Sequence, residues 1–350
     1  MRVGLNATCL NDRPMKKVVH LIPFDGIGGV EIAAQSMPDG PIDAVTIFQK
    51  WYIFADPDAQ LNHPFAYLAC LKALLREKPD LMIASLWRAY FVLILFKIIN
   101  PRAKVVTFLH NTKCAHQADR ILAWLAMHCS TAIWADSKQT IESRVPEKWH
   151  GWTRDISYLI DKPNMPISRP FKPNFVFWGR LVRQKRLDRA IRLFALIHRN
   201  WPNAKFDIIG PDQGDLARLK KQAIDAGLEV AIRFHGGLAR EACFEKARDS
   251  TFYLQTSEYE GMAVSVVEAM QRGLIPVVTP VGEIPRYCHD GSNAILVDDL
   301  EEAARRVANV LSDPEMHDAL WRAAVAEWQG QSLYRDDMIG SIKSITQGSV

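Results

Sequence analysis

The chain has 350 residues, of which 48% are hydrophobic and 23% charged, with a formal net charge of +4. This composition is ordinary for a globular protein, and the length predicts about two domains. The six cysteines form neither a Cys-x-x-Cys pair nor a cluster with histidine, which excludes a disulfide framework or zinc site and indicates reduced thiols in a cytoplasmic chain.

No signal peptide is expected, because the first residues lack an apolar core. The most lipid-like run, residues 89–96, is far shorter than the roughly 20 residues that span a bilayer, so it is predicted to be a buried helix. Positive charge is in excess only in the first half, with 19 Lys and Arg against 15 Asp and Glu in residues 1–165, and 24 against 24 afterwards. A cationic surface beside exposed aromatics would suit an anionic membrane or a lipid-linked acceptor, although scattered solvated charge explains the excess more simply.

Strand-like apolar runs alternate with helical patterns along the first half, which predicts an α/β fold with parallel sheets. Residues 1–14 precede the first strand and are expected to be irregular, with Met15 as an alternative start. The expected strands are 17–23, 44–48, 81–86, 105–109, 132–135 and 156–160, and the expected helices are 29–37, 64–76, 89–99, 115–128 and 138–145.

Residues 161–170 contain three prolines, which forbid regular structure and predict a linker. The second half then repeats the alternation and ends in a helix at 333–345. Its expected strands are 174–178, 205–209, 232–234, 251–254, 274–278 and 294–297, and its expected helices are 187–200, 215–226, 241–248, 265–273, 300–312 and 314–328.

Two carboxylates, Glu260 and Glu268, flank the turn between a predicted strand and the helix at 265–273. Backbone N–H groups at such a turn are free and carry partial positive charge, so they favour an anionic ligand. The carboxylates can accept hydrogen bonds from hydroxyl groups. A ligand that has both phosphates and hydroxyls is a sugar nucleotide.

Glu268 has a second interpretation. Ser265 and Glu268 are spaced as in a capping box, in which Glu268 would accept the Ser265 N–H, and the spacing alone favours capping and ligand binding about equally. Glu260 precedes the helix and has no such local role, so it is the stronger functional candidate.

The pattern Glu-x7-Glu, with Glu-Gly at its start and Glu-Ala-Met at its end, resembles the signature of family 4 glycosyltransferases. The resemblance implies the GT-B fold, in which two Rossmann-like domains face a central cleft, and sugar transfer with retention of configuration. Further segments in the expected order strengthen it. Met262 and Ala263 stand where Phe-Gly is common in the family, and this leaves the choice of sugar open.

Gly28 and Gly29 follow the first strand and resemble the family's Gly-Gly-x-Glu loop, whose glycines let the backbone approach donor phosphate and acceptor. A dinucleotide fingerprint is disfavoured, because the third glycine is missing and the second strand ends in Gln49-Lys50 without an acidic residue for a ribose. A tight turn with no ligand fits the same residues about equally well.

Arg180 and Lys185 follow the first strand of the second half, and ligands of open α/β sheets bind at that edge. They resemble the two cations with which the family holds the diphosphate. A departing nucleoside diphosphate gains negative charge, so fixed cations lower the barrier to its departure. A basic loop without a ligand is the alternative.

Two histidines give weaker signals. His110 ends the strand at 105–109, where the family often places a histidine near the donor sugar, although a lone histidine at a strand end is more often structural. His235, before Gly236-Gly237, resembles the segment whose backbone meets the nucleobase. The loop around Glu283 retains one glycine of a family motif and is expected to line the cleft without a catalytic role. Asp56-Pro-Asp58 mimics the metal site of single-domain transferases and is interpreted as a turn.

The resemblance implies three parts: an acceptor-side domain at 1–165, a nucleotide-sugar domain at 166–330, and a helix at 331–350 that returns to the first domain. A sugar would move from a nucleotide-diphosphate sugar, the co-substrate, to a hydroxyl of a glycan, glycolipid or other envelope-type acceptor. No permanent cofactor and no metal are expected. Glu268 would bind the ribose, and Arg180 and Lys185 would bind the diphosphate. Glu260 would bind the sugar hydroxyls, and the backbone of Gly261, Met262, Ala263 and Val264 would contact phosphate or sugar. The acceptor would enter near Gly28, Gly29 and His110.

Two other functions stay open. A GT-B sugar-nucleotide epimerase would consume the donor without an acceptor, and a non-catalytic subunit would bind the nucleotide without turnover. The complete set of Glu260, Glu268, Arg180 and Lys185 argues against the second, because a retired site tends to lose such groups. The expected location is the cytoplasm, with a peripheral contact at the inner face of the membrane, and no nucleic acid partner is expected.

Overall fold

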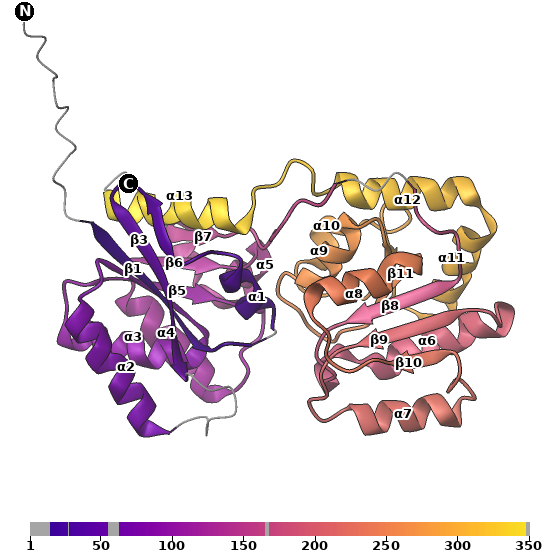
Figure 1. Cartoon of the computed structure of the whole chain (residues 1–350), viewed down its shortest axis with the longest axis horizontal. Coiled ribbons are helices and arrows are strands. Elements are labelled where there is room, and N and C mark those ends of the chain that lie inside the picture. Colours follow the sequence, from indigo (N-terminus) through magenta and orange to yellow (C-terminus); the bar gives the residue numbers. More distant parts are fainter. Residues whose placement is uncertain (1–14, 27, 55–62, 165–167, 348–350) are drawn as a thin grey trace, which may run out of the picture.

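The chain folds into two α/β domains side by side, and its last helix crosses back to the first domain (Figure 1). The computed structural model describes residues 15–26, 28–54, 63–164 and 168–347. The predicted leader and the Asp56-Pro-Asp58 triplet lie outside these ranges. The predicted α/β architecture with two parallel sheets is confirmed.

The first domain is built on a seven-stranded sheet, parallel except for the edge strand β2, which runs antiparallel to β3. Apolar side chains from both faces of this sheet pack into two separate cores, one under α2, α3 and α4 and the other under α1. In spatial order the strands are β2 (Gly40–Asp43), β3 (Thr46–Phe54), β1 (Lys16–Phe24), β4 (Leu81–Ser85), β5 (Lys104–Leu109), β6 (Ala132–Ala135) and β7 (Thr153–Asp155). The helices are α1 (Gly29–Gln35), α2 (Pro64–Glu77), α3 (Leu86–Ile99), α4 (Gln117–Cys129), α5 (Lys138–Arg144) and the 3-10 helix η1 (Glu147–Trp152).

The strand predicted at 156–160 does not form, and the sheet ends instead at β7. Ile156, Tyr158 and Leu159 of this segment are buried, but its backbone pairs with the last helix: Ser157 N–H donates to Asp337 Oδ2 at 3.0 Å, and Tyr334 N–H donates to Leu159 O at 2.7 Å. The apolar pattern thus predicted burial correctly, whereas the hydrogen-bond partner came from a distant part of the chain.

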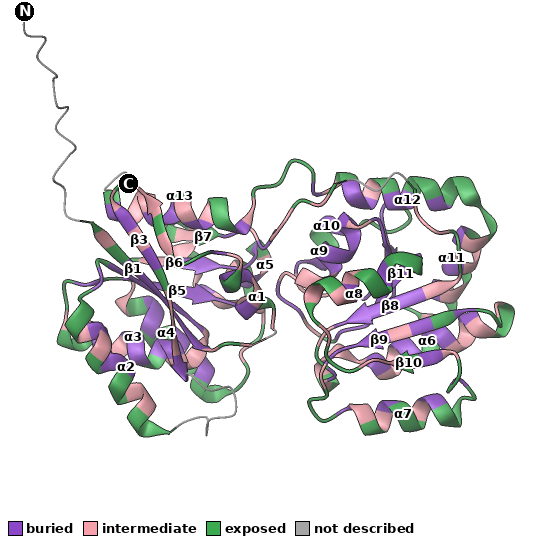
Figure 2. Cartoon of the chain, viewed as in Figure 1, coloured by how far each residue is buried: buried purple, intermediate pink, exposed green. Residues whose placement is uncertain are grey.

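The second domain is built on a six-stranded, fully parallel sheet whose central strands β8, β11 and β12 are almost entirely buried (Figure 2). In spatial order the strands are β10 (Ile232–Phe234), β9 (Lys205–Ile209), β8 (Asn174–Trp178), β11 (Phe252–Gln255), β12 (Ile275–Val278) and β13 (Ile295–Leu296). The helices are α6 (Leu187–Asn200), α7 (Leu216–Asp225), α8 (Arg240–Lys246), α9 (Val264–Gln271), the short α10 (Ile284–Tyr287), α11 (Leu300–Ser312) and α12 (Pro314–Ala326), with 3-10 turns η2 (Arg183–Lys185) and η3 (Ala247–Asp249).

The last helix, α13 (Tyr334–Gln347), belongs to the first domain although it follows the second in sequence. Tyr334, Met338 and Ile342 are buried in the same core as Phe48 and Trp134 of the first sheet. The prediction of a helix that returns across the linker is confirmed.

The order of strands reverses at β8, which lies between β9 and β11. Ligands of open α/β sheets bind at the carboxyl ends of strands at such a switch point. Arg180 follows β8, and Glu260 follows β11, so the topology places these two predicted residues at one edge of the sheet.

Within the described ranges, no helix combines the length and the apolar character that a bilayer crossing requires. In the same ranges, no three His, Cys, Asp or Glu side chains gather as a metal site would need.

Candidate functional site

Lys185 and Glu260 form a buried ion pair at the carboxyl edge of the second sheet. Lys185 Nζ lies 2.7 Å from Glu260 Oε1, and the two side chains are 12% and 6% exposed. Gln255, the last residue of β11, donates Nε2 to the same carboxylate oxygen at 3.2 Å. Gln255 Oε1 accepts in turn from Tyr253 OH and Ser265 Oγ, each at 3.0 Å. The fold therefore brings together the predicted residues Lys185 and Glu260, and Gln255 of β11 holds the Glu260 carboxylate in place.

Glu268 lies on α9 and is held by two donors. Its Oε2 accepts from Trp178 Nε1 at 3.0 Å, and its Oε1 accepts from Arg240 Nε at 2.6 Å. The N-cap of α9 is Ala263, which makes no side-chain cap, and Ser265 lies within the helix. The capping-box interpretation of Glu268 is therefore wrong. Because Trp178 ends β8, the carboxylate is fixed beside the segment that carries Arg180.

The turn between Glu260 and α9 presents unused backbone donors. In the part of the chain that the structure describes, the N–H groups of Gly261, Met262, Ala263 and Val264 donate to no protein acceptor. The turn closes through Ala263, which adopts a left-handed conformation with φ of 55°. Free N–H groups at the start of a helix carry partial positive charge, so this turn suits a phosphate.

Arg180 is exposed and faces the first domain. Its Nη1 lies 3.5 Å from Gln213 Oε1, a long contact that leaves the guanidinium available. Burial raises the pKa of Glu31 in α1, and the positive charge of Arg180 opposes that rise. Gly28 is the N-cap of the same helix. The predicted diphosphate cation thus lies near the predicted glycine turn.

His110 is buried, with its ring turned into the first domain. Its Nε2 lies 3.0 Å from Ser85 Oγ and its Nδ1 lies 2.8 Å from Tyr158 OH, so both nitrogens have protein partners. Burial, followed by the charges of His20 and Arg144, holds the pKa of His110 well below its usual range. This geometry favours the structural interpretation, and a role of the ring toward the sugar stays a prediction.

The two domains touch at the Glu260–Gly261 turn. Thr112, two residues after His110, donates Oγ1 to Glu260 O at 3.0 Å. A β-carbon on Gly261 would lie 3.1 Å from the Asn111 backbone, so glycine permits this close approach. Glu283, in the loop expected to line the cleft, accepts a backbone N–H from the start of α5 at 2.8 Å. The first domain therefore abuts the backbone that carries the best candidate residue.

His235 lies beyond β10 at the same edge of the second sheet. Its Nε2 is 2.6 Å from Asp207 Oδ1 on β9, and its N–H donates to Ile208 O at 2.9 Å. These bonds hold the segment in place. The contact of this segment with a nucleobase stays a prediction.

No sequence pattern pointed to Arg240, which connects Glu268 to the interdomain linker. Its Nη1 donates to Asp161 Oδ2 at 2.8 Å, and Arg272 Nη2 approaches the same oxygen at 3.4 Å. Burial disfavours the charge of Arg240, but Asp161 and Glu268 outweigh it and raise its pKa. Arg248, in the 3-10 turn η3 that follows α8, is an equally basic residue on the surface, and no pattern in the sequence separates the two.

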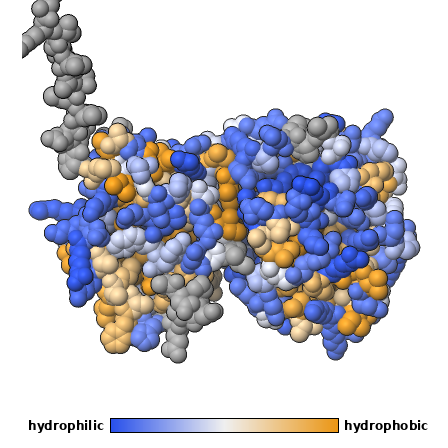
Figure 3. Space-filling model, viewed as in Figure 1, coloured by the Kyte–Doolittle hydropathy of each residue, from blue (hydrophilic) through white to orange (hydrophobic). Residues whose placement is uncertain are grey.

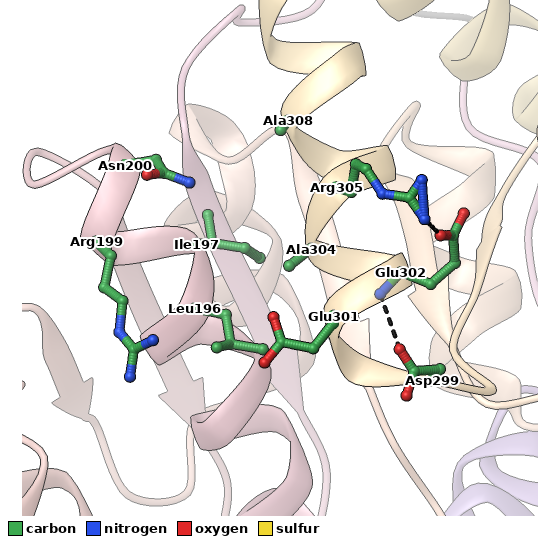
Figure 4. Close-up of a pocket in the computed structure, with 10 residues that line it drawn as sticks. All are labelled: Leu196, Ile197, Arg199, Asn200, Asp299, Glu301, Glu302, Ala304, Arg305 and Ala308. Carbon is green, nitrogen blue, oxygen red and sulfur yellow. Dashed lines mark hydrogen bonds and ion pairs between the residues drawn. The ribbon is translucent and has the colours of Figure 1, made fainter.

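A hollow of about 590 Å³ lies elsewhere, between α6 and α11 (Figure 4). Charged side chains such as Arg199, Glu301 and Arg305 line its rim, and none of the predicted site residues contributes to it. Its charges pair locally or face solvent and do not converge on one point, so it does not compete with the site at β8 and β11.

A known family model matches the half of the chain that carries the ion pair, Glu268 and the free N–H groups. Residues 166–326 match the family model described as glycosyl transferases group 1. The second domain belongs to this family. The matched range contains Arg180, Lys185, Glu260 and Glu268.

Two curated relatives of this chain are named as alpha-glycosyltransferases. Poly(glycerol-phosphate) alpha-glucosyltransferase of Bacillus subtilis is 29% identical over 171 residues, which are 46% of this chain and 24% of that protein. GDP-mannose:cellobiosyl-diphosphopolyprenol alpha-mannosyltransferase of Komagataeibacter xylinus is 27% identical over 157 residues, 44% of this chain and 40% of that protein. The matches thus span a quarter to two-fifths of the relatives' length.

Solved structures resemble the whole chain. HepE of Anabaena, in complex with UDP-glucose, superposes with a TM-score of 0.78 at 19% identity and covers 95% of this chain and 100% of its own. Sucrose-phosphate synthase of Thermosynechococcus elongatus gives a TM-score of 0.73 at 14% identity, with 96% and 100% covered. These likenesses confirm the GT-B fold of the chain.

Proposed function

We propose that this chain transfers a sugar from a nucleotide-diphosphate sugar to a hydroxyl group, with retention of anomeric configuration. The observation that carries the proposal is the grouping of Lys185, Glu260, Glu268 and unused N–H donors at the switch point of the second sheet. Cations and free amides suit a diphosphate, and fixed carboxylates suit ribose and sugar hydroxyls. One ligand class satisfies all four groups.

The ion pair of Lys185 and Glu260 suggests how the site changes when the donor binds. Lys185 is neutralised by Glu260 at 2.7 Å, and a diphosphate would compete for the same ammonium group. Glu260 would keep its Gln255 bond and turn its second oxygen toward the sugar hydroxyls. Its role is to orient the sugar and to stabilise positive charge that develops at the anomeric carbon.

The proposed reaction is the one that the family resemblance implies. The acceptor oxygen bonds to the anomeric carbon on the face from which the diphosphate leaves, the bond between that carbon and the diphosphate oxygen breaks, and the diphosphate takes the acceptor proton. Arg180 and Lys185 stabilise the charge gained by the leaving group. Replacement of either residue by alanine should cost about 2–4 kcal/mol of transition-state stabilisation. The acceptor would approach from the first domain, near Gly28 and Gly29.

We further propose an envelope-type acceptor and a cytoplasmic enzyme that meets the membrane peripherally. The name of the Komagataeibacter relative includes a diphosphopolyprenol acceptor, and that of the Bacillus relative a poly(glycerol-phosphate). No metal and no permanently bound cofactor enter the proposed chemistry.

Transfer by the purified chain tests the proposal. UDP-, GDP- and ADP-sugars are supplied with candidate acceptors, and the anomeric configuration of the product is read by nuclear magnetic resonance. Glu260→Gln should abolish transfer while its circular dichroism stays that of the wild type. An active Glu260→Gln variant, or a product with inverted configuration, would overturn the assigned role. Donor consumption without an acceptor would identify an epimerase instead.

A further inference from the structure

The outward faces of α2, α3 and α4 differ from the rest of the surface. These helices lie next to one another under the first sheet, and their inner sides share one core (Figure 1). Their outer sides leave large apolar groups in solvent, and Figure 3 shows apolar surface where α2 lies. We call this the α2–α4 face and define it by Phe65, Leu68, Phe91, Ile98, Ile121 and Trp124, which are 38–70% exposed.

The exposure follows from the pattern of each helix. On α2, Phe65 and Leu68 are one turn apart and exposed, whereas Cys70, Leu71 and Leu74, further along the helix, are buried. The central helix, α3, is apolar on all sides, which is typical of a helix that is covered all round. Its Phe91 and Ile98 are nevertheless exposed. Phe91 touches Tyr67 of α2 edge-on, with ring centroids 5.5 Å apart, so within the described chain this side of the helix is only partly covered.

Positive charge accompanies these apolar groups. Residues 64–129 contain nine Lys and Arg against three Asp and Glu, a net charge of +6 (9 − 3), which exceeds the +4 of the whole chain. The three acids are already engaged: Glu77 pairs with Lys17, Asp80 accepts the Lys17 N–H, and Asp119 pairs with Arg144.

Several of the basic groups are free. Lys72, Arg76, Arg102 and Arg120 are exposed and, among the described residues, have no acidic partner. Their positive charge is therefore available to a negatively charged surface outside the protein.

We propose that the α2–α4 face docks on the surface of an anionic lipid bilayer. Apolar side chains would enter the headgroup region while Lys and Arg stems reach the lipid phosphates. Two copies of a face that, within the described chain, carries the unpaired cations Lys72, Arg76 and Arg120 would repel each other in a symmetric dimer, which disfavours a second copy as the occupant. The biological role of this docking depends on the proposed function, since it would bring the first domain to a lipid-linked acceptor.

Flotation with lipid vesicles tests this surface. The full chain is mixed with phosphatidylcholine vesicles, or with the same vesicles containing 30% phosphatidylglycerol, at about 50 and 500 mM salt. We expect binding to the anionic vesicles, weakened by salt because surface charge is screened. Each Lys or Arg near such a surface contributes about fivefold in affinity, so Lys72→Gln with Arg76→Gln should weaken binding about 30-fold.

A second variant removes the apolar part of the face. Phe65→Ser with Trp124→Ser should reduce vesicle binding at least tenfold. The matched control replaces exposed residues of the same kinds on α7 of the second domain, with Ile224→Ser, Lys220→Gln and Lys221→Gln, and should bind as the wild type does. Equal binding by all variants, or no binding of the wild type to anionic vesicles, would overturn the proposal. So would a concentration-dependent dimer that Phe65→Ser with Trp124→Ser dissolves.

Donor binding separates this proposal from the proposed function. The same variants are heated with nucleotide-diphosphate sugars, and the donor site should stabilise them as it does the wild type. Vesicle binding without any donor effect would refute the transferase proposal and leave the α2–α4 face standing.

Discussion

Removal of the Arg240 guanidinium should loosen Glu268 and weaken nucleotide binding. In the structure, Arg240 Nε donates to Glu268 Oε1 at 2.6 Å, and the Glu268 side chain is only 7% exposed. In Arg240→Met the buried carboxylate would keep a single donor, Trp178. Loss of one partner from a buried ion pair costs about 3–5 kcal/mol. Because the Arg240 side chain is 21% exposed, water replaces part of the lost bond, and we expect the free energy of unfolding to fall by about 2–3 kcal/mol.

The control for this variant is Arg248→Met. Arg248 pairs with Glu245 at 2.7 Å, but the two side chains are 75% and 61% exposed, so the pair should contribute less than about 1 kcal/mol. Urea unfolding followed by tryptophan fluorescence measures the stability of the two variants, and calorimetric titration measures their affinity for nucleoside diphosphates. Arg240→Met should bind nucleoside diphosphates at least about tenfold more weakly, a loss of about 1.4 kcal/mol in binding free energy. Arg248→Met should bind them as the wild type does. Equal stability and equal affinity of the two variants would refute the reasoning.

Further predictions concern the backbone and pH. Gly282→Ala should lower donor affinity, because the new β-carbon would collide with the Glu260 carbonyl group. The control Gly291→Ala has a similar left-handed φ but open space around it, so it should cost only about 1 kcal/mol of stability. Equal donor affinity of the two variants would contradict this prediction. Burial, followed by the charge of Lys50, lowers the pKa of His20 from 6.5 to about 3, so the unfolded chain binds the proton more readily and stability should fall as pH drops below 6.5. The His20 contribution to this loss approaches about 1.4 kcal/mol per pH unit, so urea unfolding at pH 7 and pH 5 should show a smaller fall in stability for His20→Gln than for the wild type. Buried His110, whose pKa is also lowered, keeps its own contribution, and replacement of an exposed histidine, His128→Gln, should leave the fall unchanged. An unchanged slope in His20→Gln would count against a neutral, buried His20.

The order of elements could be predicted because it depends on local patterns. Alternating apolar runs and helical periods placed most strands and helices within a few residues, and the three prolines of 161–170 marked the boundary. The segment 156–160 failed because its hydrogen-bond partners, in α13, lie about 180 residues away. No local pattern carries that information.

The site was predictable where residues occupy strand ends. Glu260 and Lys185 lie at the carboxyl edge because they follow β11 and β8, and their direct contact fits that expectation. The packing around them was not predictable: the Ser265 spacing suggested a cap, whereas the hydroxyl bonds to Gln255. His110 illustrates the same limit, since a strand end does not reveal which way a ring turns.

Thermal stabilisation by donor is the most direct measurement of the central claim, that Lys185 and its neighbours bind a nucleotide-diphosphate sugar. The wild type, Lys185→Gln and the control Lys172→Gln are heated with UDP-, GDP- and ADP-sugars; Lys172 also pairs with a carboxylate, Asp249, but on the exposed surface. At a hundred times the dissociation constant, binding should stabilise the wild type and Lys172→Gln by about 2.7 kcal/mol. At the same donor concentration Lys185→Gln should show little stabilisation. A wild type that no sugar nucleotide stabilises, or a Lys185→Gln variant stabilised as strongly as the control, would contradict the account.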